Sequence, residues 1–232
     1  MDRQEEDNLF IDLEDVRIHY ECLGQGPDLI MIHGNGEDLH LFDEASKELS
    51  NDFKVWLLDS RGHGESSSVD TYHYEDMSSD VTAFIRKLGL EGAILFGYSD
   101  GGIIGLLTAI RAPGVLSGLI CAGANTEPSM LDPEVYRECE EWNREHDDPR
   151  MTMMLNEPHI TVEELSTIRI PTYVMAGSND CILREDTDRI ARTIGCSELR
   201  IVEGHDHSSY IEDHSILSGL IRDAYSFITD NR

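Results

Sequence analysis

Short apolar runs recur along this sequence and alternate with segments of helical spacing. DLIMIH (28–33) and FKVWLLD (53–59) are continuous apolar runs, which are typical of strands buried on both faces. Further short strands are predicted at AILFG (93–97), LSGLICAG (116–123), PTYVMAG (171–177) and ELRIVEG (198–204). The alternation predicts an α/β fold with a doubly wound, mostly parallel sheet.

The segments between these strands have helical patterns. Apolar residues at helical spacing predict a helix over 74–88, which Gly89 ends. GGIIGLLTAI (101–110) is apolar on nearly every side, so we expect a central buried helix. Other helices are predicted over 39–49, 185–193 and 211–228.

The first strands of the chain have a different pattern. LFIDLE (9–14) and VRIHYECL (16–23) alternate between apolar and polar residues and are separated by a very short turn. They are therefore predicted to form an antiparallel pair at the start of the sheet.

One segment interrupts the alternation of strands and helices. No strand is expected between Asn125 and Thr167, whereas Asp132 and Pro133 favour the start of a helix, which Pro149 should end. We interpret residues 126–166 as a short helical lid inserted in a single domain that spans 1–232. Long insertions at the carboxyl edge of a parallel sheet commonly serve a ligand.

Composition limits the classes of partner. The chain of 232 residues carries 18 Lys and Arg against 46 Asp and Glu, a net charge of −28. Such an acidic protein repels nucleic acid and anionic membranes, so neither is an expected partner. The five cysteines have no CxxC spacing and are expected to be reduced thiols, and the N-terminus lacks an export signal. We expect a cytoplasmic protein; its oligomeric state is left open.

A catalytic serine is indicated by GYSDG (97–101), which lies directly after a predicted strand and before the buried helix. This is the strand–turn–helix context that the G-x-S-x-G pattern requires for a nucleophile elbow. The helix that follows directs free N–H groups toward negative charge that develops beside Ser99.

The sequence resembles the α/β-hydrolase family over nearly all of its length. The resemblance rests on five motifs in the family's order: HGNG (33–36), DSRGHG (59–64), GYSDGG (97–102), GSND (177–180) and EGHDHSSY (203–210). It implies a serine hydrolase with a small lid and a Ser-Asp-His catalytic triad.

The resemblance implies a role for individual residues. Ser99 matches the nucleophile, and Asp180 matches the acid that orients the histidine. The base is His205 or His207; we favour His207, because the family's base usually lies three residues beyond a glycine such as Gly204.

The backbone N–H groups of Asn35 and Asp100 are the predicted oxyanion hole, with Gly36 as the alternative to Asn35. His33 and the DSRGHG motif are expected to brace the loops around the site. Tyr98, Trp142, Met153 and Met154 are predicted to line the substrate pocket.

Several other chemistries fit less well. Asp100 as a nucleophile would require glycine where Tyr98 stands, which argues against a dehalogenase or an epoxide hydrolase. The pattern His205-Asp206-His207 lacks the rest of a metal-binding motif, and HExxH is absent, so neither a metal nor a cofactor is expected. GQG and HGNG do not lead to Gly-Lys-Ser/Thr, as a phosphate-binding loop does.

The expected activity is hydrolysis of a small carboxylic ester or thioester, a small-molecule substrate, through an acyl-enzyme. Carbon–carbon bond hydrolysis or perhydrolysis on the same triad is an alternative. A ligand-binding or signalling protein with little turnover is another alternative.

Overall fold

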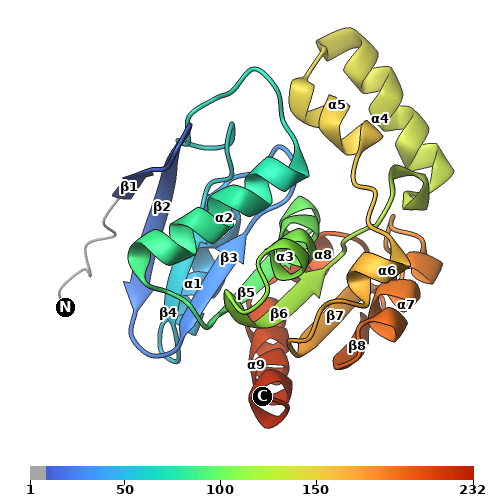
Figure 1. The fold of residues 1–232 in the computed structure, drawn as a ribbon. Helices are drawn as coiled ribbons and strands as arrows, with labels where there is room; N and C mark the ends of the chain where they lie inside the picture. Colours follow the sequence, from blue (N-terminus) through green and yellow to red (C-terminus); the bar gives the residue numbers. More distant parts are fainter. Residues whose placement is uncertain (1–8) are drawn as a thin grey trace.

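The computed structural model describes residues 9–232, and these form an eight-stranded sheet with strand order β1-β2-β4-β3-β5-β6-β7-β8 (Figure 1). The strands are β1 (Leu9–Asp12), β2 (Arg17–Gly24), β3 (Asp28–Ile32), β4 (Lys54–Leu58), β5 (Ala93–Tyr98), β6 (Leu116–Ala122), β7 (Thr172–Gly177) and β8 (Ser197–Val202). β2 pairs in antiparallel fashion with both β1 and β4, and the sheet is parallel from β4 to β8. The predicted strands, the initial antiparallel pair and the mostly parallel sheet are confirmed.

Helices cover both faces of the sheet (Figure 1). They are η1 (Leu39–Phe42), α1 (Asp43–Leu49), α2 (Tyr74–Leu88), α3 (Asp100–Arg111), η2 (Pro128–Met130), α4 (Pro133–His146), α5 (Pro149–Asn156), α6 (Val162–Leu165), α7 (Arg184–Thr193), α8 (Ser209–Glu212) and α9 (His214–Asp230). One apolar core lies under η1, α1, α8 and α9, and the other lies under α2, α3, α6 and α7. None of the helices within residues 9–232 combines the length and apolar character needed to cross a bilayer.

Two predicted helices are divided in the structure. The segment over 39–49 begins as the 3₁₀ helix η1 and continues as α1. The last predicted helix is interrupted at Asp213, whose carboxylate accepts hydrogen bonds from the backbone N–H groups of Ser215 and Ile216 at 3.1 and 3.3 Å. Asp213 is therefore the N-cap of α9, and α8 is a separate turn.

The segment over 126–166 contains η2, α4, α5 and α6, and α4 and α5 lie beyond one end of the sheet (Figure 1). Our prediction that Pro149 ends α4 is wrong. α4 ends at His146, where Asp147 has a left-handed backbone with φ of 50°. Pro149 begins α5 instead, because the first turn of a helix needs no backbone N–H from proline.

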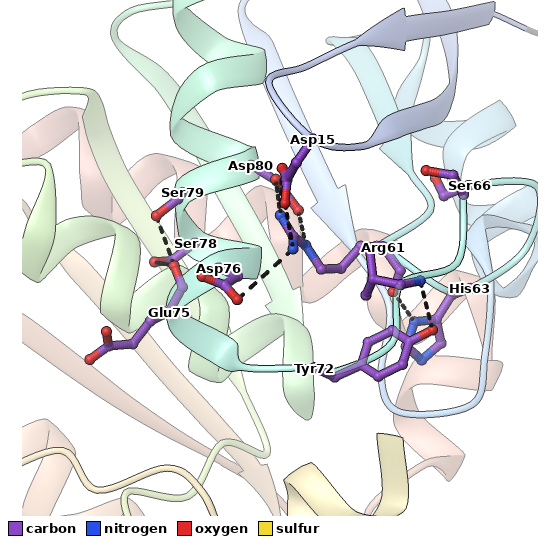
Figure 2. Close-up of polar contacts among 12 residues, drawn as sticks. Asp15, Arg61, His63, Ser66, Tyr72, Glu75, Asp76, Ser78, Ser79 and Asp80 are labelled. Atoms are coloured by element: carbon purple, nitrogen blue, oxygen red, sulfur yellow. Dashed lines mark hydrogen bonds and ion pairs between the residues drawn. The ribbon is translucent and has the colours of Figure 1, made fainter. Parts of the chain in front are cut away.

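A buried arginine joins three segments on one side of the sheet (Figure 2). Arg61, in the turn after β4, makes a bidentate contact with Asp80 of α2, with nitrogen-to-oxygen distances of 2.6 and 2.7 Å. It also reaches Asp15 in the β1–β2 turn at 3.3 Å. Arg61 is only 5% exposed and Asp80 is 8% exposed, so the pair is largely removed from water.

Replacement of Arg61 by methionine should destabilise the protein strongly. Removing one partner of a buried ion pair leaves the Asp80 carboxylate uncompensated, which costs about 3–5 kcal/mol of unfolding free energy. Urea denaturation at neutral pH measures this loss. The matched control is Arg184→Met, which removes an exposed ion pair with Asp188 and should cost less than about 1 kcal/mol. Equal losses in the two variants would contradict a structural role for the buried pair.

Candidate active site

Ser99 lies at the sharp turn between β5 and α3. Its φ of 53° is in the left-handed region, which non-glycine residues rarely adopt. A Cβ atom at Gly97 would collide with the backbone of Gly101, and one at Gly101 would collide with the carbonyl oxygen of Ile32. Glycine at both positions lets β5, α3 and β3 approach closely enough to hold this strained turn.

Three loops bring a serine, a histidine and an aspartate together. His207 Nε2 lies 3.1 Å from Ser99 Oγ, and His207 Nδ1 lies 2.7 Å from Asp180 Oδ1. Asp180 follows β7 and also accepts a hydrogen bond from the Ile182 N–H at 2.9 Å. The three side chains therefore form a continuous hydrogen-bonded chain at the carboxyl end of the parallel strands.

The surroundings of His207 set its protonation chemistry. Burial lowers the pKa of His207, but the hydrogen bond and negative charge of Asp180, with a smaller contribution from Cys181, outweigh it, so the pKa lies above its ordinary value. With Nδ1–H donating to Asp180, Nε2 of the neutral ring is free to accept the proton of the Ser99 hydroxyl. This is the arrangement of a general base.

His205, the alternative base, is directed elsewhere. Its Nδ1 lies 3.1 Å from Ser209 Oγ at the start of α8. Within residues 9–232, His207 is the only histidine that makes a hydrogen bond with Ser99.

The loop after β3 lies beside Ser99. His33 Nδ1 donates to the Gly34 carbonyl at 2.7 Å, and its Nε2 accepts from the Ser60 N–H at 3.1 Å. His63 Nε2 accepts from the Gly36 N–H at 3.1 Å. Burial lowers the pKa of both imidazoles, to about 4 for His63, so the neutral rings fit these bonds.

The loop after β3 has a backbone N–H donor that could bind an oxyanion. The backbone N–H of Asn35 has no hydrogen-bond acceptor among the described residues. Asp100 is the first residue of α3, where backbone N–H groups lack partners within the helix. Both predicted oxyanion donors thus belong to segments that border Ser99.

A pocket of about 200 Å³ opens in front of the serine. Its lining includes Gly34, Asn35, Glu37, Tyr98, Ser99, Asp100, Asn125, Leu131, Val135, Cys139, Met151, Met154, Cys181, Ile182 and His207. The sheet end provides its floor, and α4 and α5 provide one wall.

Two of the four predicted pocket residues, Tyr98 and Met154, line this pocket, whereas Trp142 and Met153 do not. Trp142 lies further along α4, is 43% exposed and stacks on His146 with ring centroids 4.1 Å apart. Met153 points about 100° around α5 from Met154 and is buried in the core.

Comparison with known proteins places this chain in a family. A family model described as alpha/beta hydrolase fold matches residues 27–141. An esterase from Thermogutta terrifontis superposes with a TM-score of 0.76 at 22% identity, covering 92% of this chain and 94% of that chain. The chain belongs to the alpha/beta hydrolase family.

Curated relatives of this alpha/beta hydrolase match over shorter stretches. An uncharacterized hydrolase, YraK, of Bacillus subtilis is 35% identical over 99 residues, which cover 41% of this chain and 36% of that protein. A pimeloyl-[acyl-carrier protein] methyl ester esterase of Vibrio parahaemolyticus is 32% identical over 116 residues, covering 50% and 44%. The chain thus spans less than half the length of these relatives.

The side chain of Asp100 is a feature of this alpha/beta hydrolase that the sequence analysis missed. Its carboxylate accepts hydrogen bonds from the Tyr74 hydroxyl at 2.6 Å and from the Asn35 side-chain amide at 2.9 Å. Burial raises the pKa of Asp100 to about 6, although these two donors lower it. Asp100 therefore ties the elbow to α2 and to the loop after β3.

Glu37 is a second residue that the sequence did not reveal. Its carboxylate accepts a hydrogen bond from the Gly34 N–H at 2.9 Å and faces the pocket beside Tyr98. Burial raises the pKa of Glu37, whereas the Gly34 N–H and His207 lower it. The local sequence HGNGED (33–38) indicates only a turn. The position of the Glu37 carboxylate in the site follows from the folded loop.

Within residues 9–232, one group of potential metal ligands lies in this region. Ligand atoms of Asp180, Cys181 and His207 lie within 4.8 Å of one another. The His205-Asp206-His207 pattern considered from the sequence is not such a group.

Replacement of Tyr74 by phenylalanine should cost more stability at pH 8 than at pH 5. With a pKa of about 6, Asp100 is ionised at pH 8, and a hydrogen bond to a buried charge contributes about 1.5–3 kcal/mol. At pH 5 Asp100 is mostly protonated, so the same bond is weaker. Denaturation of both proteins at the two pH values measures the difference.

Tyr72→Phe is the control, because within residues 9–232 the Tyr72 hydroxyl accepts a single long hydrogen bond, from the Val69 N–H at 3.5 Å. Its effect should be small and the same at both pH values. A Tyr74→Phe loss that does not depend on pH would contradict an ionised Asp100.

Proposed function

We propose that this chain is a serine hydrolase that cleaves small carboxylic esters or thioesters through an acyl-enzyme. One observation carries the proposal: the unbroken hydrogen-bonded chain from Ser99 Oγ through His207 to Asp180 at the floor of a pocket. In this proposal Ser99 is the nucleophile, His207 the general base and Asp180 the residue that orients it.

In the first half-reaction Ser99 Oγ attacks the ester carbonyl as His207 Nε2 removes its proton. Asp180 stabilises the imidazolium that forms and holds the ring in the required orientation. The carbonyl oxygen becomes an oxyanion that the N–H groups of Asn35 and Asp100 stabilise, aided by the amino-terminal end of α3. The imidazolium then protonates the leaving alcohol or thiol, and the acyl group remains on Ser99.

In the second half-reaction water takes the place of the leaving group. His207 removes a proton from the water, the hydroxide attacks the acyl carbonyl, and the same two N–H groups stabilise the second oxyanion. The imidazolium returns the proton to Ser99 Oγ, which releases the carboxylic acid and restores the free enzyme.

The pocket supports a small acyl group. Its volume of about 200 Å³ lies below the ~300–1,000 Å³ of pockets for drug-sized ligands. Leu131, Val135 and Met154 give it apolar walls, and the two helices α4 and α5 form a lid within the segment 126–166. One relative, the pimeloyl-[acyl-carrier protein] methyl ester esterase of Vibrio parahaemolyticus, supports an ester substrate.

Replacement of Ser99 by alanine should lower kcat/KM for p-nitrophenyl acetate and butyrate by about 1,000-fold or more, because the nucleophile is removed. Ser129→Ala, which changes a serine outside the catalytic pocket, should retain full activity. Circular dichroism establishes that both variants fold. A Ser99→Ala variant with substantial remaining turnover would refute the serine mechanism.

Replacement of Asp180 by asparagine should lower kcat by about 10⁴-fold at neutral pH, since the imidazole loses its orientation and its counter-charge. The base acts only when neutral, so activity falls as pH drops below the pKa of His207. Asp180 raises that pKa, and its loss should move the acidic limb of the remaining activity to lower pH. A pH–rate profile of purified protein measures both effects.

Asp206→Asn serves as the control, because Asp206 is next to His207 in sequence but its carboxylate accepts hydrogen bonds from the backbone N–H groups of Ser208 and Ser209 at the start of α8. Its acidic limb should match that of the wild type. An unchanged limb in Asp180→Asn would mean that Asp180 does not control His207.

A further inference from the structure

We infer that Asp180, Cys181 and His207 form a binding site for a zinc-class divalent ion, and that the ion switches off the hydrolase when bound. The binding site is a property of these three side chains alone. The inhibitory effect rests on the proposed function, because it requires His207 to be the general base.

The spacing of the three side chains fits a small tetrahedral ion. Zinc binds nitrogen and oxygen at about 2.0–2.2 Å and sulfur at about 2.3 Å, so neighbouring ligand atoms lie about 3.3–3.7 Å apart. The ligand atoms here all lie within 4.8 Å of one another. Asp180 Oδ1 and His207 Nδ1, now 2.7 Å apart, would need to separate by only about half an ångström.

The chemistry of the ligands selects the ion. A thiolate, an imidazole and a carboxylate together are a typical ligand set for zinc, whereas magnesium and calcium prefer oxygen ligands alone. Three protein ligands leave a fourth tetrahedral position for water. Cys181 and His207 both line the catalytic pocket, so an ion can enter from the same side as substrate.

The electrostatic surroundings attract a cation. Glu37 also lines the pocket, close enough for its carboxylate to interact with His207, and Glu212 contributes further negative charge. The chain as a whole carries a net charge of −28. A divalent ion therefore enters a strongly negative field.

Metal binding and hydrolysis exclude one another. The ion uses an imidazole lone pair, and it replaces the proton through which Asp180 holds His207. The metal-bound ring can no longer accept a proton from Ser99 and relay it. The thiol of Cys181 neither attacks the substrate nor transfers a proton in the proposed hydrolysis, whereas in the metal-bound state it is a direct ligand.

Titration with cobalt(II) tests the site directly. Protein treated with a chelator and desalted is titrated with Co²⁺, whose thiolate complexes show a near-ultraviolet charge-transfer band and intense visible bands when tetrahedral. We expect both, saturating at about one ion per chain, and displacement of the cobalt by Zn²⁺. Cys181→Ser should abolish the charge-transfer band and weaken Zn²⁺ binding at least about 10-fold.

Cys139→Ser is the matched control, because Cys139 lines the same pocket but lies outside the three-residue group. It should keep the band. Cys181→Ala, checked by circular dichroism, provides a second variant in case the serine variant does not fold. Three outcomes would overturn the assignment: the wild type shows no charge-transfer band, folded Cys181 variants keep the band, or Cys139→Ser loses it.

Two further measurements separate this site from the proposed function. Ser99→Ala should bind Co²⁺ as the wild type does, since Ser99 is not a ligand. Zn²⁺ should inhibit wild-type ester hydrolysis with the midpoint found for binding, and a chelator should restore activity. A protein that binds cobalt but hydrolyses no ester would retain the metal site and refute the hydrolase. Full ester hydrolysis with Zn²⁺ bound would refute inhibition.

Discussion

The close packing of β3, β5 and α3 is the constraint on which the site depends. Glycine at 97 and 101 removes the Cβ atoms that would hold the strand and helix apart. The chain can then turn within one residue, and Ser99 is held at a φ of 53° at the tip. The buried, almost wholly apolar helix α3 keeps the strained backbone of Ser99 in place. Relaxing the turn would move the helix outward and expose its buried residues to water.

The other parts of the site are connected to this turn by buried polar groups. Asp100 bonds Tyr74 of α2 and Asn35 of the loop after β3, and His63 accepts a hydrogen bond from Gly36 in that loop. These bonds fix the loop that borders Ser99, so the donors of the proposed oxyanion hole are held in place before any substrate arrives. Such preorganisation is what makes backbone donors effective, since no reorganisation is needed during the reaction.

The proposed metal site and the proposed triad share the side chains of Asp180 and His207. The same group of residues can therefore exist in two states. With a proton between Asp180 and His207, the imidazole is oriented for base catalysis. With a divalent ion bound there and to Cys181, the imidazole is a ligand. The two states are exclusive because a lone pair on one nitrogen accepts either a proton or a metal.

The sequence by itself determined the order of strands and helices, the parallel sheet and the position of the candidate nucleophile elbow. Each follows from local patterns such as apolar runs and glycine spacing, whereas the candidate acid and base were implied by the resemblance to the family. The tertiary structure decided which of two histidines meets Ser99, and it placed Trp142 and Met153 away from the pocket and Glu37 and Cys181 in it. The reason is physical: a side chain's partners depend on how separate loops and helices pack. In residues 126–166, that packing decides which side chains face the pocket and which face the core or solvent. Local patterns fix where an element lies along the chain, whereas long-range packing fixes what each of its faces contacts.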